Sequence, residues 1–225
     1  MGRSQYTGLP RAPHLIGLPA ASMQNGGWKP VAVECIYLSS SEIYAPLYPC
    51  EVEIIVISPG GRGFLSGGGG GGCAYKRRRV LPNEKLILTI DPGTTATNFY
   101  DTRGSISIDG VTVTGGQNGS SSQAAGDPFG GIGGVATGGQ INNNGGQGGR
   151  WSGGGERGGS AASLTGPGLM ASTASTGPYS GGGGSAGGGP SSGGGGQNYG
   201  GGGGGGGEGG GQGGAHLCIL RFIPV

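Results

Sequence analysis

Residues 193–214 of this chain read GGGGQNYGGGGGGGGEGGGQGG, and this stretch decides how the chain can fold. Bare glycine runs carry no side chains, so they cannot bury an apolar core of their own. The stretch is therefore either a flexible tether, as Gly/Ser tracts often are, or a segment whose backbone packs against backbone. It ends a longer tract, residues 115–214, whose barest runs are Gly181–Gly184, Gly193–Gly196 and Gly200–Gly207.

Packing of backbone against backbone has a defined form. Glycine adopts the extended left-handed polyproline II conformation, with three residues per turn and a rise of about 3.1 Å per residue. The N–H and C=O groups then point outward, and neighbouring runs can pair them because no Cβ blocks their approach. An eight-residue run would span roughly 25 Å. We favour such a polyglycine II bundle over a tether because the tract contains little Lys or Glu and is followed by the strand-like Leu217–Ile223.

The composition excludes several classes of protein. Glycine makes up 63 of the 225 residues, but there are only 14 prolines and no strict Gly-X-Y period, which excludes collagen. The net charge of +2 is too small to predict a nucleic-acid partner or a membrane surface from its field. We find no run of about 20 apolar residues, so we expect no membrane insertion.

The four cysteines, Cys35, Cys50, Cys73 and Cys218, form no C-x-x-C pair, and the chain has only two histidines. We therefore expect neither a metal site nor a cofactor, and we favour buried, reduced thiols over the three possible disulfide connectivities. Residues 1–30 show no apolar core of a secretory signal and predict an extended attachment arm, with a frayed terminus as the alternative.

The residues between this arm and the glycine tract predict a β-rich domain at 31–114, in a mainly β fold with irregular structure and almost no α-helix. Glu42–Pro49 contains two prolines and cannot be a central strand. Glu51–Ser58 is apolar on both faces from Ile54 to Ile57, which indicates burial on both sides. Alternation predicts strands at 31–38, 51–58, 73–80 and 85–91, two short strands at 105–109 and 111–114 hinged at Gly110, and a closing strand within 215–225 that returns to the β domain.

Two features bear directly on function. Lys76–Arg79 is the one basic cluster; it fits either a contact with phosphate or acidic glycan, or a solvated edge strand, and we favour the edge strand. The acidic residues are scattered along the chain. We find no Ser/His/Asp set and no phosphate-binding glycine motif in the sequence context that such sites require. The sequence thus favours a protein that is not an enzyme.

The motifs follow one another in a distinctive order. A strand at Val52–Ser58 precedes the bare run Gly67–Gly72, then come Cys73–Ala74–Tyr75, a strand–turn–strand unit, the Ser/Thr-rich piece Gly104–Gly116 that ends in Thr-Gly-Gly, and the closing Leu217–Phe222. In this order, the chain resembles the glycine-rich domain of bacteriophage tail-fibre and tail-tip proteins. It is also similar to the glycine-rich distal adhesin of T-even-like phages, although here the longest runs lie near the C-terminus.

The resemblance implies a virion tail protein, made in the host cytoplasm, in which stacked polyglycine helices hold loops that bind the bacterial surface. It implies a homotrimer, docking to other tail proteins through the arm, and a surface polysaccharide or outer-membrane protein as receptor. A purely structural virion component without receptor contact is the alternative, and ice binding is a third hypothesis. Bulky residues interrupt the tract as candidate receptor contacts, or alternatively as plugs that seal a bundle end: Phe129, Arg150, Trp151, Tyr179, Asn198 and Tyr199.

Overall fold

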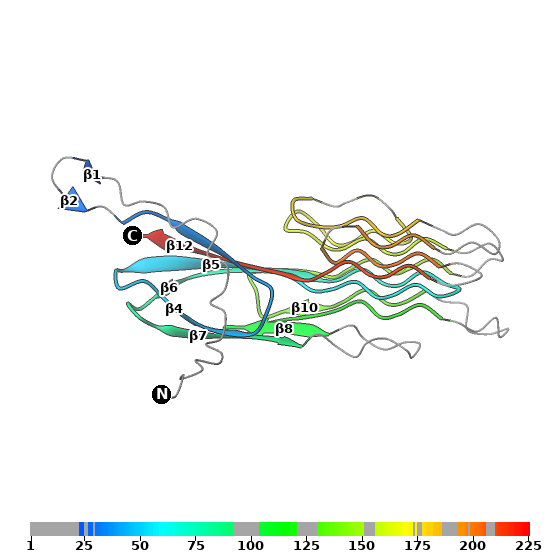
Figure 1. The fold of residues 1–225 in the computed structure, drawn as a ribbon, viewed down its shortest axis with the longest axis horizontal. Helices are drawn as coiled ribbons and strands as arrows, with labels where there is room; N and C mark the ends of the chain where they lie inside the picture. Colours follow the sequence, from blue (N-terminus) through cyan, green and yellow to red (C-terminus); the bar gives the residue numbers. More distant parts are fainter. Residues whose placement is uncertain are drawn as a thin grey trace, which may run out of the picture.

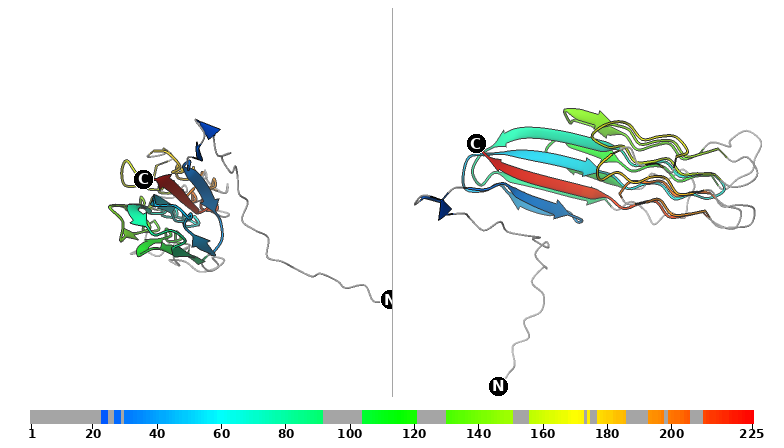
Figure 2. Two further views of the ribbon diagram at one scale, coloured as in Figure 1. Left: turned by 90° about the vertical axis from the view of Figure 1, so that its left-hand side faces the viewer. Right: turned by 90° about the horizontal axis from the view of Figure 1, so that it is seen from above.

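A computed structural model describes residues 23–24, 27–28, 30–91, 104–120, 130–150, 156–172, 174, 177–185, 193–197, 199–205 and 210–225. These residues form two five-stranded antiparallel sheets and a short hairpin, and they contain no helix. The sheets occupy one half of an elongated molecule. Glycine-rich segments continue from the strands along the same long axis and fill the other half (Figures 1 and 2).

The first sheet has the order β11-β6-β5-β12-β3 and the second has the order β10-β9-β8-β7-β4. The strands of the first sheet are β3 (Val33–Tyr37), β5 (Cys50–Ile57), β6 (Cys73–Val80), β11 (Ile141–Asn143) and β12 (Leu217–Pro224). Those of the second are β4 (Ser41–Tyr44), β7 (Lys85–Asp91), β8 (Ser105–Ile108), β9 (Val111–Thr114) and β10 (Ala136–Thr137), while β1 (Met23–Gln24) and β2 (Gly27–Trp28) form the hairpin.

β5 is the central strand of the first sheet and is buried on both faces, as its sequence predicted. Val52, Ile54 and Val56 face the second sheet and share one core cluster with its strands. Ile55 and Ile57, which point the other way, pack in a second cluster with Ala161 and Ala162 of the glycine tract. The first sheet is therefore covered by the second sheet on one side and by part of the glycine tract on the other.

Most of the predicted strands are confirmed, with ends that differ by one or two residues. The hinge at Gly110 is a two-residue hairpin turn in which Asp109 and Gly110 have φ of 52° and 76°, as the connection between β8 and β9 requires. Five strands were not predicted, and two of them, β1 and β2, form the hairpin within residues 1–30, where the sequence predicted an extended arm. β4 is an edge strand that ends before its two neighbouring prolines, while β10 and β11 lie inside the glycine tract and add one edge strand to each sheet.

The four cysteines have free thiols, and Cys50, Cys73 and Cys218 are buried. Burial raises the pKa of Cys73 and that of Cys218 to about 12 each. Both thiols are therefore protonated at neutral pH, which disfavours thiolate chemistry at these two positions.

The run Gly67–Gly72, here called the central run, lies inside the glycine-rich half. Three successive N–H groups of this run donate hydrogen bonds to carbonyls of three different neighbouring segments. Their acceptors are Gly149 for Gly67 (3.1 Å), Gly203 for Gly68 (2.8 Å) and Gln117 for Gly69 (2.9 Å). The next two N–H groups return to the first two segments three residues along, because Gly70 donates to Gly146 (2.8 Å) and Gly71 to Gly200 (2.6 Å).

The carbonyls of the central run accept from three further segments with the same spacing of three residues. Gly131 and Gly134 donate to Gly67 and Gly70, Gly159 and Ala162 donate to Gly68 and Gly71, and Gly61 and Ser58 donate to Gly69 and Gly72. Three segments on the donor side and three on the acceptor side surround the central run. We call the resulting array of hydrogen-bonded extended segments the glycine lattice.

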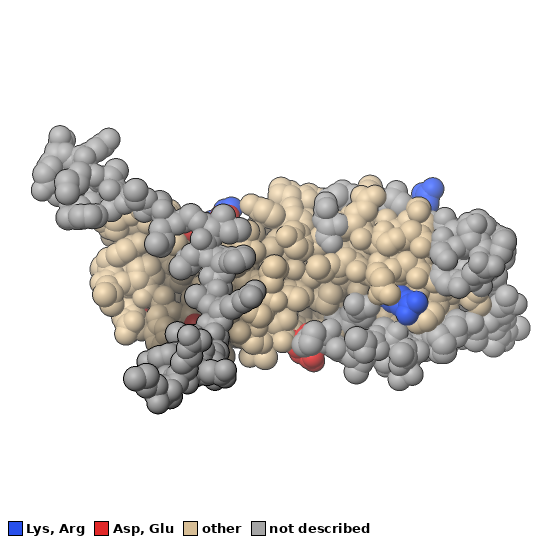
Figure 3. Space-filling model, viewed as in Figure 1, with Lys and Arg blue, Asp and Glu red and all other residues tan. Residues whose placement is uncertain are grey.

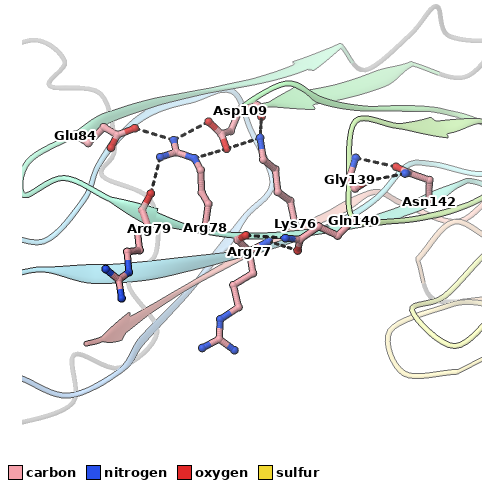
Figure 4. A network of polar contacts seen from close by, with 9 residues as sticks. All are labelled: Lys76, Arg77, Arg78, Arg79, Glu84, Asp109, Gly139, Gln140 and Asn142. Atoms are coloured by element: carbon pink, nitrogen blue, oxygen red, sulfur yellow. Dashed lines mark hydrogen bonds and ion pairs between the residues drawn. The ribbon is translucent and has the colours of Figure 1, made fainter.

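Three residues of the basic cluster on β6, Lys76, Arg77 and Arg78, form ion pairs within the molecule. Arg78 Nη2 lies 2.7 Å from Asp109 Oδ1 and 2.7 Å from Glu84 Oε1, and Lys76 Nζ lies 3.0 Å from Asp109 Oδ2 (Figure 4). Arg77 pairs with Glu51 at 2.7 Å. β11 pairs only with Cys73–Tyr75, so the remainder of β6 forms an edge of the sheet. The Lys76 and Arg78 pairs with Asp109 link β6 to the β8–β9 turn of the second sheet, whereas the Arg77 pair joins β6 to β5. For these three residues, the pairs favour a structural role over phosphate binding.

Asp109→Asn is expected to destabilise the fold by about 1–3 kcal/mol, because charge-assisted hydrogen bonds are lost at a partly buried site. Burial alone would raise the pKa of the Asp109 carboxyl, but hydrogen bonds from Arg78 and Lys76 outweigh it and hold the pKa below its ordinary value. This stabilisation is complete above about pH 4 and is lost as the pH falls through the lowered pKa. Urea denaturation measured from about pH 2 to pH 7 gives the free energy of unfolding at each pH. This free energy should fall less steeply toward acidic pH in the variant than in the wild type.

Glu42→Gln is the matched control, because Glu42 pairs with Lys85 on the exposed surface. We expect Glu42→Gln to leave the decrease in unfolding free energy at acidic pH nearly the same as in the wild type. If the unfolding free energy of the wild type and that of Asp109→Asn fell equally at acidic pH, this would contradict a stabilising role for the Asp109 pairs.

Candidate functional site

The end of the molecule away from the sheets, here called the distal end, collects the tips of many extended segments (Figure 1). The turn at residues 62–66 lies here, with the Arg62 guanidinium 4.9 Å from the centre of the Phe64 ring. The N–H of Leu65 donates to the carbonyl of Ser120 at 3.0 Å, and that of Gly205 donates to the carbonyl of Glu156 at 2.6 Å. Described residues that flank four segments lie near this end, and the segments themselves are outside the described residues: 121–129, 151–155, 186–192 and 206–209.

A cavity of about 510 Å³ lies near the distal end, and residues from four neighbouring segments line it. Its lining includes Arg150 and Glu156, which carry opposite charges, and the side chains of Gln147 and Met170. Met170 is 69% exposed, so it offers an apolar surface to an entering ligand. The rest of the lining is mostly glycine backbone: Gly130, Gly148 and Gly149, together with Ala171.

The local sequence explains how Arg150 and Gln147 reach this cavity. Residues 144–150 read Asn-Gly-Gly-Gln-Gly-Gly-Arg, so a side chain recurs at every third position. The intervening glycines donate to neighbouring segments: Gly145 and Gly148 to one, and Gly146 and Gly149 to another. Asn144, Gln147 and Arg150 therefore share the remaining face of the segment, which lies toward solvent.

Hydrogen bonds hold the cavity walls in place. The Gln147 side-chain amide donates to the carbonyl of Gly130 at 3.5 Å. The N–H of Gly149 donates to the carbonyl of Arg157 at 2.8 Å, which fixes the segment carrying Arg150 beside the one carrying Glu156. The N–H of Ala171 donates to the carbonyl of Gln147 at 2.8 Å, which fixes the third wall. The side chains thus project from backbone that is tied on several sides.

Three of the six candidate contact residues are among those that the structure describes, and of these three only Arg150 lies at this cavity. Arg150 lines it, whereas Phe129, Trp151 and Asn198 lie outside the described residues. Tyr179 and Tyr199 lie near the first sheet instead. The hydroxyl of Tyr179 accepts a hydrogen bond from Arg221 of β12 at 3.3 Å, and the half-buried Tyr199 packs against the second core cluster.

The two tyrosines therefore do not form one site with Arg150, because the length of the glycine segments separates them. Gln147, Glu156, Met170 and Ala171 also line the cavity, and none of them was among the candidates. The spacing of three in residues 144–150 is the signal that could have found Gln147, since three residues per turn place Gln147 and Arg150 on one face. No comparable pattern marks Glu156 or Met170.

No protein-family model matches this sequence, and a search of curated proteins finds no match either. Among the described residues, none lies in a helix with the length and apolar character to cross a membrane. Within the same residues, no group of three or more His, Cys, Asp or Glu side chains is placed to hold a metal ion.

Proposed function

We propose that this chain is a virion tail-fibre or tail-tip protein that binds the bacterial surface through loops on a rigid glycine-rich scaffold. The scaffold is a bundle of polyglycine II helices that hydrogen-bond to one another. The observation that carries this proposal is the glycine lattice, in which the central run pairs with six neighbouring segments and its bonding pattern repeats after three residues. Three residues per turn is the period of the polyproline II conformation.

The lattice supports a display role because its segments are hydrogen-bonded to one another and carry few side chains. Binding residues tend to lie on loops that a rigid framework positions. Here, the described residues that flank these four segments lie at the distal end, where the cavity around Arg150 also lies. The sheets occupy the opposite half, which leaves them available for attachment to other tail proteins, with residues 1–30 as the proposed arm. The homotrimer implied by the resemblance belongs to the same proposal.

Cell binding by the purified full-length chain tests this function. We expect a fluorescently labelled chain to bind some strains in a panel of bacteria, and to compete there with adsorption of the phage that encodes it. The double variant Arg150→Ala, Trp151→Ala is expected to lose most of this binding with little change in Tm, because Arg150 is exposed and contributes little to the core.

A structural virion component would give a different result. If no strain binds the chain, and if antibody labelling of the virion locates it away from the tail tip, the receptor-binding proposal is wrong. Labelling at the tail tip together with strain-specific binding would support it.

A further inference from the structure

We infer that the cavity around Arg150 is a saccharide subsite for a neutral hexose unit of a surface polysaccharide, an inference that rests on the proposed function. Its volume of about 510 Å³ is within the usual range for small-ligand sites of roughly 300–1,000 Å³. The site is formed by side chains from three segments whose backbones are hydrogen-bonded to one another. Little rearrangement is therefore needed to bind a ligand.

The chemistry of the lining fits adjacent hydroxyl groups. Arg150, Glu156 and Gln147 end in a guanidinium, a carboxylate and a carboxamide, and each of these groups is planar with two or more hydrogen-bonding atoms. A planar group of this kind can contact two neighbouring hydroxyls of a sugar ring at once. Together, the three supply both donors and acceptors, as hydroxyls that donate and accept require.

The rest of the lining fits the apolar face of a sugar ring. The thioether of Met170 is soft and polarisable, and it packs against irregular apolar surfaces. A Cβ at Gly149 would lie 3.1 Å from the Glu156 side chain, so the absence of a side chain at Gly149 leaves room for a ring beside Glu156. One face of the ring would contact Met170, while hydroxyls at its edge would contact the polar groups.

The charge of the lining favours a neutral sugar over an acidic one. Among the cavity residues, Arg150 and Glu156 carry one charge each, of opposite sign, so their sum is zero. An acidic sugar would gain attraction from Arg150 but would be repelled by Glu156. The described surface in Figure 3 is also largely uncharged over the glycine-rich half. The site therefore selects by hydrogen-bond geometry rather than by net charge.

An oligosaccharide array tests this inference with the full-length chain. The probes are oligosaccharides of neutral hexoses and matched oligosaccharides that contain uronic acids. We expect binding to the neutral set that is nearly unchanged between about 0.05 and 0.5 M NaCl, because little of it comes from net charge. Arg150→Ala should weaken this binding at least about tenfold, and Gln147→Ala should weaken it by about threefold or more.

Arg157→Ala is the matched control, because Arg157 is an exposed arginine next to Glu156 in sequence but does not line the cavity. It should leave binding unchanged, and all variants should keep the wild-type Tm. Equal losses for the Arg150 and Arg157 variants would overturn the assignment of the site. Preferential binding of uronic acids, with Glu156→Gln strengthening it, would overturn the assignment of a neutral ligand.

This test separates the subsite from the function. If the chain binds cells but none of the oligosaccharides, the neutral-hexose subsite is wrong while the surface-binding function stands. If it binds neither, both proposals are wrong.

Discussion

Gly70→Ala is expected to destabilise the protein by about 3 kcal/mol or more, and to lower its Tm by roughly 6–12 °C. A Cβ at this position would lie 1.9 Å from the carbonyl oxygen of Ser160 and 2.4 Å from its carbonyl carbon. Both atoms are backbone, held in the lattice by their own hydrogen bonds, so no rotation of a side chain can relieve the overlap. The neighbouring segment must move away.

This movement would also break hydrogen bonds of Gly70 itself. Its N–H donates to Gly146 at 2.8 Å and its carbonyl accepts from Gly134 at 2.8 Å, so a shift disturbs several segments at once. Thermal and urea denaturation of the full chain measure the effect. The substitution tests the lattice directly, because alanine adds only one methyl group and no charge.

Gly166→Ala is the matched control for Gly70→Ala. A Cβ at residue 166 would meet no atom within 4 Å, and Gly166 is among the glycines without positive φ. We expect this variant to be neutral, or more stable by about 0.4–1 kcal/mol because alanine restricts the unfolded chain. Equal Tm values for the two variants would mean that the central run is not packed as described.

Amide hydrogen exchange in the central run is expected to be at least about a thousandfold slower than in an unfolded chain of the same sequence. The N–H groups of Gly67–Gly71 all donate to carbonyls at 2.6–3.1 Å, and each of these glycines is buried. Exchange here requires several segments to separate together. A thousandfold slowing corresponds to an opening free energy of about 4 kcal/mol, well within the stability of an ordinary domain.

The exposed turn around Leu47, where the side chain is 83% exposed, supplies an internal comparison and should exchange rapidly. Exchange followed by mass spectrometry on overlapping peptides resolves the two regions. Fast exchange throughout residues 58–72 and 200–205 would show that the glycine-rich half is a flexible tether in solution. The proposed display of binding residues would then lose its support.

The predictions for Gly70→Ala and for amide exchange both test whether the glycine lattice is rigid, and this rigidity matters for the proposed binding function. A ligand that meets preformed walls at Arg150, Gln147 and Met170 loses less entropy on binding than one that must order a loop. If Gly70→Ala loosens the lattice without unfolding the sheets, saccharide and cell binding should fall although every contact residue is still present. Such a result would separate the supporting role of the lattice from direct contact.

Much of the β-rich half follows from local sequence. Alternation in Lys85–Asp91 places Leu86, Leu88 and Ile90 on one buried face, and the apolar residues on both sides of β5 predicted its burial on both faces. The turn at Gly110 follows from glycine's tolerance of positive φ. In each case, the signal lies within a few neighbouring residues, so no distant contact is needed to interpret it.

The strands missed in the glycine tract show where such local reasoning stops. Ala136–Thr137 and Ile141–Asn143 are too short to show alternation, and each becomes a strand because a sheet edge offers it partners: Val113 and Thr112 for one, and Cys73–Tyr75 for the other. Likewise, Tyr179 and Tyr199 resemble Arg150 in standing out among small neighbours, yet only Arg150 reaches the distal cavity. A bulky residue among small neighbours can be noticed in the sequence, but the sequence does not show where in the fold that residue lies.

The sequence by itself determined that bare glycine runs either stay unpaired or pair backbone with backbone, since they have nothing else to bury. It also determined the long strands, because their apolar faces need a core. Only the tertiary structure decided which runs lie side by side, and therefore which side chains meet at the cavity. The physical reason is that glycine runs are nearly identical to one another. Their order is set by strand pairing in the attached sheets and by contacts between residues far apart in the chain.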